Sequence, residues 1–162
     1  SRNVNTLESV VLSVTRIQGG NTWNVLPEHV ELEGNLRTHD AAIRAQVKKR
    51  VEAIAGGLAQ AFDAGIAVTW FDGPDALVNH PQWADFAREV ANEHGYRTAE
   101  ADLHMGGEDF AVYLQQIPGA FVSIGSDSPY GLHHPAFNPD EGLIDEAARY
   151  FARLAEKALQ HP

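Results

Sequence analysis

Residues 29–62, HVELEGNLRTHDAAIRAQVKKRVEAIAGGLAQAF, contain the two patterns that decide the fold. In residues 29–37, apolar and polar side chains alternate, which is typical of a strand with one buried face and one wet face. Arg37 belongs to the wet face, and the apolar face carries Val30, Leu32 and Leu36. Asp40 is a favourable N-cap for the segment that follows. Apolar residues then recur every three or four positions and predict a long amphipathic helix: Ile43, Val47, Val51, Ile54, Leu58 and Phe62.

Two further strands are predicted, one on each side of this strand and helix. Residues 8–18, ESVVLSVTRIQ, are rich in β-branched residues and end at the turn pair Gly19-Gly20. Residues 66–70, IAVTW, alternate again after the helix ends near Ala64-Gly65. The order β-β-α-β, with antiparallel character, predicts an α+β layer in which a helix covers a sheet.

The turn-rich stretch DGPDALVNHP (72–81) is a candidate domain boundary. A helix is expected from Pro81, a residue favoured at helix starts, to Gly95, a residue favoured just after helix ends. Its apolar residues follow helical spacing and indicate a core: Trp83, Phe86, Ala87, Val90 and Ala91. A short strand at 96–102 and a short helix ending at Leu114 complete this region.

The last part of the chain predicts a strand and a helix. Residues 120–125, AFVSIG, form a compact apolar run and are expected to be a buried strand. Asn138 is expected to cap the final helix, with Pro139 at its first position. One face of this helix is lined by Ile144, Ala148, Phe151, Ala155 and Ala158.

Composition excludes several classes of protein. The 162 residues carry 12 basic and 22 acidic side chains, a formal net charge of -10, which disfavours binding to nucleic acid or an anionic membrane surface. There is no cysteine, so a disulfide framework and a thiolate metal site are excluded within these residues. No run approaches the ~18 apolar residues that a membrane span requires. We therefore expect a cytoplasmic globular protein.

His133-His134 is the leading candidate for chemistry. The pair lies in the loop SDSPYGLHHPAFNP, after the predicted buried strand and before the last helix. Sites in α/β proteins are commonly placed on such loops, and neutral imidazole is a common metal ligand. The alternative is a pair of solvent-exposed loop histidines, because no second ligand lies nearby at helical spacing.

Three polar residues elsewhere are weaker candidates. Asn24 lies in a glycine-to-proline turn and offers a donor and an acceptor in one amide. Arg37, thirteen positions later, could hold a carboxylate with two parallel hydrogen bonds. Glu108, next to Asp109, could act as a general base or a metal ligand. The alternatives are an ordinary hairpin with a solvated arginine, and acidic residues that complement a helix dipole.

Taken in order, several motifs resemble one enzyme family. They are GGNTWNVLP (19–27), GNLRT (34–38), GGEDFAVYL (106–114), IPGAFVSIG (117–125) and LHHPAFN (132–138). Their order and spacing are similar to those of the co-catalytic metallopeptidases of peptidase family M20, which include aminoacylase, hippurate hydrolase and indole-acetyl-amino-acid hydrolase. Each motif is weakly specific, whereas the ordered set covers nearly the whole chain.

The resemblance implies a fold class that combines α/β and α+β parts. Residues 1–78 would be part of a ferredoxin-like lid and dimerisation domain that lacks its first strand and helix. Residues 79–162 would be the C-terminal part of an α/β/α zinc-peptidase-like catalytic domain. The family is roughly twice this length or more, so we expect this chain to be a fragment.

The resemblance also implies roles for individual residues. His133 would bind one of two divalent ions (zinc, manganese, cobalt or nickel), with His134 and Glu108 as further possible site residues. Asn24 and Arg37 would bind an N-acyl amino acid or a similar small amide, often across a homodimer formed through the lid sheet. Two positions depart from the family pattern. His134 stands where serine or asparagine is more usual, and Gly107 stands where serine is common.

The implied reaction is metal-assisted amide hydrolysis, with two ions that polarise the carbonyl and activate a water. The general-base glutamate and the other ligands would lie upstream, so the isolated chain is expected to be inactive and to contain no catalytic residue. Two alternatives remain. One is a non-catalytic dimerisation or binding module, and the other is a catalytically dead relative.

Overall fold

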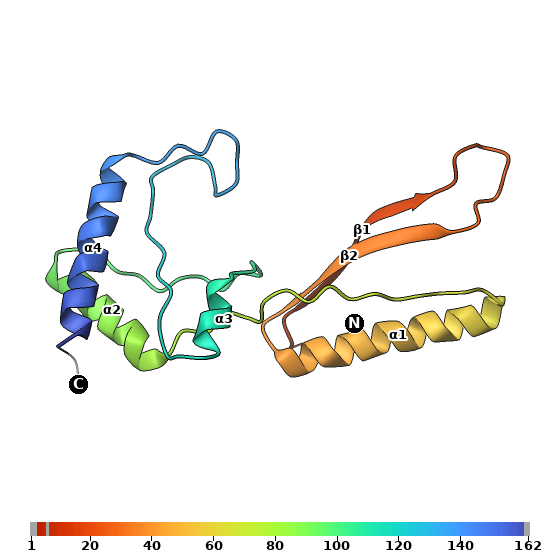
Figure 1. The fold of residues 1–162 in the computed structure, drawn as a ribbon, viewed down its shortest axis with the longest axis horizontal. Helices are drawn as coiled ribbons and strands as arrows, with labels where there is room; N and C mark the ends of the chain where they lie inside the picture. Colours follow the sequence, from red (N-terminus) through yellow and green to blue (C-terminus); the bar gives the residue numbers. More distant parts are fainter. Residues whose placement is uncertain (1–2, 6, 161–162) are drawn as a thin grey trace. The chain divides into compact units, whose positions relative to one another are not determined.

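The computed structural model describes residues 3–5 and 7–160 and divides into two compact units (Figure 1). The first unit comprises Ser1–Ala76 and His104–Asp109, and the second comprises Leu77–Leu103 and Phe110–Pro162. The division after Ala76 falls inside the turn-rich stretch 72–81. The grouping of the segment 104–109 with the first unit was not predicted from the sequence. No helix within the described residues is long and apolar enough to cross a membrane.

The first unit contains an antiparallel hairpin. Strand β1, Val10–Gly19, pairs with β2, Val30–Thr38, and both expected strands are confirmed to within two residues. The register shifts between Val14 and Arg16, which is a β-bulge. A Cβ atom at Gly34 would lie 2.3 Å from the carbonyl oxygen of Ser13. The two backbones therefore approach so closely that only glycine fits at position 34.

The expected burial of β2 is confirmed only at its end. Leu36 is half-buried and Thr38 is buried, whereas Val30 and Leu32 are more than half exposed. The prediction of a buried face along the whole strand is therefore wrong. The reason is that helix α1 packs against β2 near Thr38, and the described part of the chain places no other element over the far end of the hairpin.

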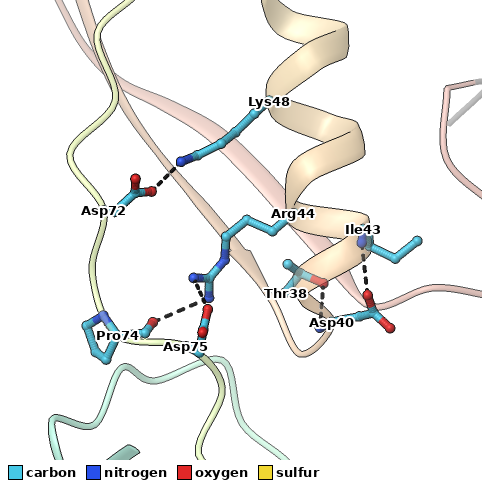
Figure 2. A network of polar contacts seen from close by, with 8 residues as sticks. All are labelled: Thr38, Asp40, Ile43, Arg44, Lys48, Asp72, Pro74 and Asp75. Carbon is cyan, nitrogen blue, oxygen red and sulfur yellow. Dashed lines mark hydrogen bonds and ion pairs between the residues drawn. The ribbon is translucent and has the colours of Figure 1, made fainter. Parts of the chain in front are cut away.

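Helix α1, Ala41–Phe62, follows β2 as predicted. The Asp40 side chain accepts a hydrogen bond from the Ile43 N–H at 2.9 Å, so the expected N-cap is confirmed (Figure 2). The helix ends at Asp63, which adopts a left-handed conformation with φ 51°. The apolar stripe is buried or half-buried at its start and exposed at its end, in Ile54, Leu58 and Phe62.

Side chains of α1 hold the segment that returns beside the helix (Figures 1 and 2). The interacting α1 residues are four positions apart, about 6 Å along the helix, and their partners are two or three positions apart, about 7–10 Å of extended chain. The pairs are Arg44 with Asp75 and the Pro74 carbonyl, Lys48 with Asp72, and Glu52 with the Trp70 indole N–H. The Lys48 ammonium also lies 5.3 Å from the Trp70 ring centroid.

The strand predicted at residues 66–70 is not formed. This segment runs without helical turns beside α1, but it pairs with no strand among the described residues. The alternation of apolar and polar residues in this segment correctly predicted that its backbone is not helical. It could not predict that charged side chains of α1, rather than a neighbouring strand, would hold the segment.

The second unit is built around helices α2, Pro81–Glu93, and α4, Gly142–Ala158, with the short helix α3, Phe110–Leu114. Its core joins α2 to α4 through Val90, Ala91 and Tyr150, with Phe86, Tyr96, Val122 and Leu154 packed around them. The Tyr150 hydroxyl donates to the Ala87 carbonyl at 2.9 Å, and burial raises the pKa of this phenol. The predicted extents of α2 and α3, and the apolar face of α2, are confirmed.

The final helix differs from its prediction in two ways. It begins at Gly142 rather than at Pro139, because Asp140 accepts the Gly142 N–H at 3.1 Å and closes a turn before the helix. The face that packs on the core is the neighbouring one, formed by Leu143, Ala147, Tyr150 and Leu154. The predicted face, including Ile144 and Phe151, is mostly exposed. Helical periodicity identified two adjacent apolar stripes and could not choose between them.

The strands predicted at 96–102 and 120–125 are also not formed in the described structure. One side chain holds the second of these segments. The Asn79 amide donates to the Phe121 carbonyl at 2.9 Å and accepts the Phe121 N–H at 2.8 Å. Next to it, the His80 N–H donates to the Gly119 carbonyl at 2.9 Å. The Asn79 amide thus makes the pair of hydrogen bonds that a neighbouring strand would otherwise supply.

We predict that Asn79→Ala lowers the free energy of unfolding by about 1–3 kcal/mol, because Phe121 loses a donor and an acceptor together. Urea unfolding would show a lower midpoint at an unchanged slope. Asn79→Asp keeps only the acceptor and should fall between Asn79→Ala and the wild type. Gln82→Ala, on the exposed side of α2, is the control. An unchanged midpoint in Asn79→Ala would contradict this role.

Candidate functional site

The loop that carries His133 consists of two consecutive turns in the second unit. The His134 N–H donates to the Gly131 carbonyl at 3.2 Å, and the Phe137 N–H donates to the His134 carbonyl at 2.9 Å. His133 is the third residue of the first turn and has φ 66°. A positive φ at that position is typical of a type II turn, where glycine or asparagine is usual. His133 is therefore held in a conformation that few side chains adopt.

The imidazole of His134 makes one hydrogen bond and one stacking contact. Its Nδ1 accepts the Ala136 N–H at 3.0 Å, and its ring stacks on Tyr130 with centroids 4.4 Å apart and planes within 8°. Both histidines were predicted from the sequence as candidate site residues, but Tyr130 was not. Its position, four residues before His134 in a loop with proline and glycine, could have indicated the stacking contact.

The imidazole of His133 is available for a ligand. Its residue is exposed, and among residues 3–5 and 7–160 its ring makes no hydrogen bond, ion pair or stacking contact. A neutral imidazole of this kind fits a divalent transition-metal ion. No group of three or more histidine, aspartate or glutamate side chains in the described chain gathers as a metal site. An exposed His133 is compatible with the predicted role of a single ligand, and the described residues contain no complete centre.

Arg37 is joined to the segment 104–109 within the first unit. Its Nη1 donates to the Met105 carbonyl at 2.5 Å, while the residue itself is exposed near the end of β2. The segment is folded on itself, because the His104 Nδ1 accepts the Gly106 N–H at 3.1 Å. A Cβ atom at Gly106 would lie 2.8 Å from that nitrogen. The sequence could not indicate the Met105 contact, since a backbone carbonyl has no residue-specific signature.

Asn24 and Glu108 complete the set of predicted residues. Asn24 lies in the loop between β1 and β2, where its Oδ1 accepts the Thr22 hydroxyl at 3.2 Å. Glu108 is half-buried and belongs to the segment 104–109. The first unit therefore brings Arg37 into contact with the segment that carries Glu108, and it also contains Asn24. His133 and His134 belong to the second unit.

The comparisons with known proteins give a consistent result. The model of Peptidase family M20/M25/M40 matches residues 8–157. The chain belongs to this family. The predicted resemblance is thereby confirmed, and the match includes every candidate site residue named above. The mixed α/β architecture of the described residues, with a two-stranded sheet and four helices, agrees with part of such a peptidase.

Three curated relatives of this M20 chain carry names of deacetylases. N-acetylcysteine deacetylase of Bacillus subtilis is 39% identical over 99% of the chain and 42% of the relative. N-acetyl-L-cysteine deacetylase of the same organism is 40% identical over 98% of the chain and 38% of the relative. N-acetyldiaminopimelate deacetylase of a Geobacillus strain is 35% identical over 93% and 40%, respectively. The chain thus spans about two fifths of the length of these relatives.

A solved structure supports the same assignment. The YXEP protein of Bacillus subtilis, described as a dinuclear metal binding peptidase from the M20 family, superimposes with a TM-score of 0.84. It is 38% identical to the M20 chain and covers 94% of it, whereas the chain covers 43% of that structure.

Proposed function

We propose that this M20 chain forms part of a metal-dependent amidohydrolase that cleaves the amide bond of N-acyl amino acids. Its relatives are named for the deacetylation of N-acetylcysteine and N-acetyldiaminopimelate, and the solved relative is described as dinuclear. Both substrate names describe a small acyl group on an amino acid. The observation in this chain that carries the proposal is the exposed imidazole of His133. Among the described residues, no side chain forms a hydrogen bond, ion pair or stacking contact with it.

Each candidate residue has a distinct role in this proposal. Two bound divalent ions would supply the polarisation of the scissile carbonyl and a water of lowered pKa. His133 would hold one of these ions through its imidazole. Asn24 would hydrogen-bond a substrate oxygen, and Arg37 would bind the carboxylate with the guanidinium donors that Met105 does not use. Glu108 remains a candidate for the same site.

The remaining ligands and the general-base glutamate would come from residues beyond these 162, so the isolated chain would not hydrolyse the substrate. The share of the relatives that the chain spans, about two fifths, supports this division. A dinuclear centre also needs more donors than one imidazole provides.

A second candidate function is self-association through the hairpin. The described sheet has only two strands, so β1 and β2 each have an outer edge without a strand partner in the described residues. Its apolar side chains are unusually exposed, among them Leu12, Val14, Ile17 and Leu32. Exposed apolar surface beside open strand edges favours pairing with a second copy. In the proposed enzyme, this hairpin would serve as a lid and a dimer contact.

We predict that His133→Asn in the complete protein removes most bound divalent metal and lowers deacetylation of N-acetyl-L-cysteine at least about 100-fold, because a metal ligand is lost. Asparagine tolerates the positive φ, so the turn should survive. Metal content by atomic emission and steady-state rates provide the measurement. His39→Asn, an exposed histidine of the first unit, is the control. Full metal content in His133→Asn would refute the proposal.

We predict that Arg37→Lys raises KM for N-acetyl-L-cysteine about 10- to 100-fold, because lysine keeps the charge and loses the paired hydrogen bonds to a carboxylate. The matched comparison is N-acetyl-L-cysteinamide, which lacks that carboxylate and should be affected much less. An equal rise in KM for both substrates would show that Arg37 does not bind the carboxylate.

We predict that the complete protein sediments as a dimer and that Leu32→Lys shifts it toward monomer, since a charge would enter an apolar contact. Leu32 is 62% exposed in the described chain, so this substitution should leave the fold intact. Glu31→Lys, its neighbour on the opposite face of β2, is the control. A monomeric wild-type protein at micromolar concentration would exclude the self-association function.

A further inference from the structure

His134 is the corner on which both turns of the 130–137 loop depend. Its backbone N–H closes the first turn on Gly131, and its carbonyl closes the second on Phe137. Its ring also binds the Ala136 N–H through Nδ1. This last bond is the one that asparagine or aspartate side chains make in an Asx-turn. The backbone N–H of His134 thus closes the turn at residues 131–134, while its carbonyl and its ring both fix residues 134–137.

The hydrogen bond to Nδ1 makes His134 a poor metal ligand. Nδ1 accepts the Ala136 N–H with its lone pair, so that nitrogen cannot bind an ion while the bond persists. In the neutral ring the proton is then on Nε2. An ion bound at Nε2 would force the proton onto Nδ1, where it would face the Ala136 N–H. Coordination through either nitrogen would therefore break the hydrogen bond from the Ala136 N–H to Nδ1.

The Tyr130 ring fixes the remaining freedom of the His134 side chain. The two rings are nearly parallel, at a centroid separation of 4.4 Å. Stacked aromatic rings restrict each other's rotation, and the Tyr130 N–H is itself held by the Ser128 hydroxyl at 3.2 Å. The stack therefore ties His134 to the part of the loop that precedes the first turn.

We propose that Tyr130 and His134 form a positioning pair that keeps His133 in its left-handed conformation and so directs its imidazole as a metal ligand. The inference rests on the proposed function of His133 as a ligand. Left-handed backbone is uncommon for residues other than glycine and persists only where the surroundings impose it. Without the pair, His133 would relax to a negative φ, and its imidazole would turn away from the orientation in which it binds the metal ion.

The variants that test the pair separate the stack from the turn. Tyr130→Ala removes the stack, and Tyr130→Phe keeps it. His134→Ala removes both the stack and the Nδ1 acceptor, whereas His134→Asn keeps an acceptor for the Ala136 N–H. Circular dichroism and thermal unfolding establish that each variant is folded, and Tyr130→Leu replaces Tyr130→Ala if that variant does not fold.

The measured quantity is the affinity of the complete protein for Zn²⁺ and Mn²⁺, determined by competition with a chromophoric chelator. We expect Tyr130→Ala and His134→Ala each to weaken binding about 10- to 100-fold, the range typical of groups that orient metal ligands. Tyr130→Phe should bind as the wild type does, and His134→Asn should lie between. Because the two residues act together, the double alanine variant should lose little more than the weaker-binding single variant.

Activity at saturating metal distinguishes positioning from coordination. Excess metal should restore hydrolysis in Tyr130→Ala and His134→Ala, but not in His133→Asn. If His133→Asn retains metal, the proposed function fails. If His133→Asn loses metal while both alanine variants bind it normally, only the positioning pair is overturned. If His134→Ala and His134→Asn lose metal as completely as His133→Asn, His134 is a ligand, and the inference is wrong.

Discussion

Extended backbone needs hydrogen-bond partners, and in this M20 chain side chains supply them at Phe121 and at Pro74, where no neighbouring strand does. Asn79 binds both polar groups of Phe121 in the second unit. In the first unit, Arg44 binds the Pro74 carbonyl while its charge pairs with Asp75. A backbone group without a hydrogen-bond partner is costly where it is shielded from water, so these contacts favour the observed paths of the two segments.

The same constraint shapes the loop around His133. Two turns close on the backbone of His134, and the imidazole of His134 satisfies a further N–H in place of an asparagine. His134 is thereby bound to the loop, and His133 alone of the two keeps its ring available. Adjacent and chemically identical side chains therefore differ in their contacts, because in the described residues a hydrogen bond and the Tyr130 stack hold only the ring of His134. In the first unit, Arg37 donates to the Met105 carbonyl through Nη1, and its other guanidinium donors are not used in that contact.

Exposed apolar surface is the other general feature of the chain. The hairpin exposes most of its aliphatic side chains, and α4 exposes a second apolar stripe that includes Ile144 and Phe151. Burial of such surface is the main favourable contribution to folding and association. For the hairpin, the strand edges that have no partner in the described residues support the proposed self-association. The described residues give no comparable indication for the stripe on α4.

The sequence by itself determined the elements whose causes are local. The Asp40 cap and the apolar spacing of α1 predicted that helix, β-branched alternation predicted β1 and β2, and ordered motifs predicted the M20 family. Each of these depends on residues within a few positions of one another, or on a pattern shared with relatives.

Only the tertiary structure decided which apolar faces of the helices and strands are buried. It also decided which extended segments pair as strands. Residues 66–70 and 120–125 have the composition of strands, but strand pairing requires a neighbour that composition does not specify. Likewise, α4 has two apolar stripes, and contact with α2 selects the one that contains Tyr150. The hydrogen bond from Arg37 to Met105 could not be predicted from the sequence either. It depends on how the chain folds back in space, and the Met105 acceptor is a backbone atom that every residue possesses.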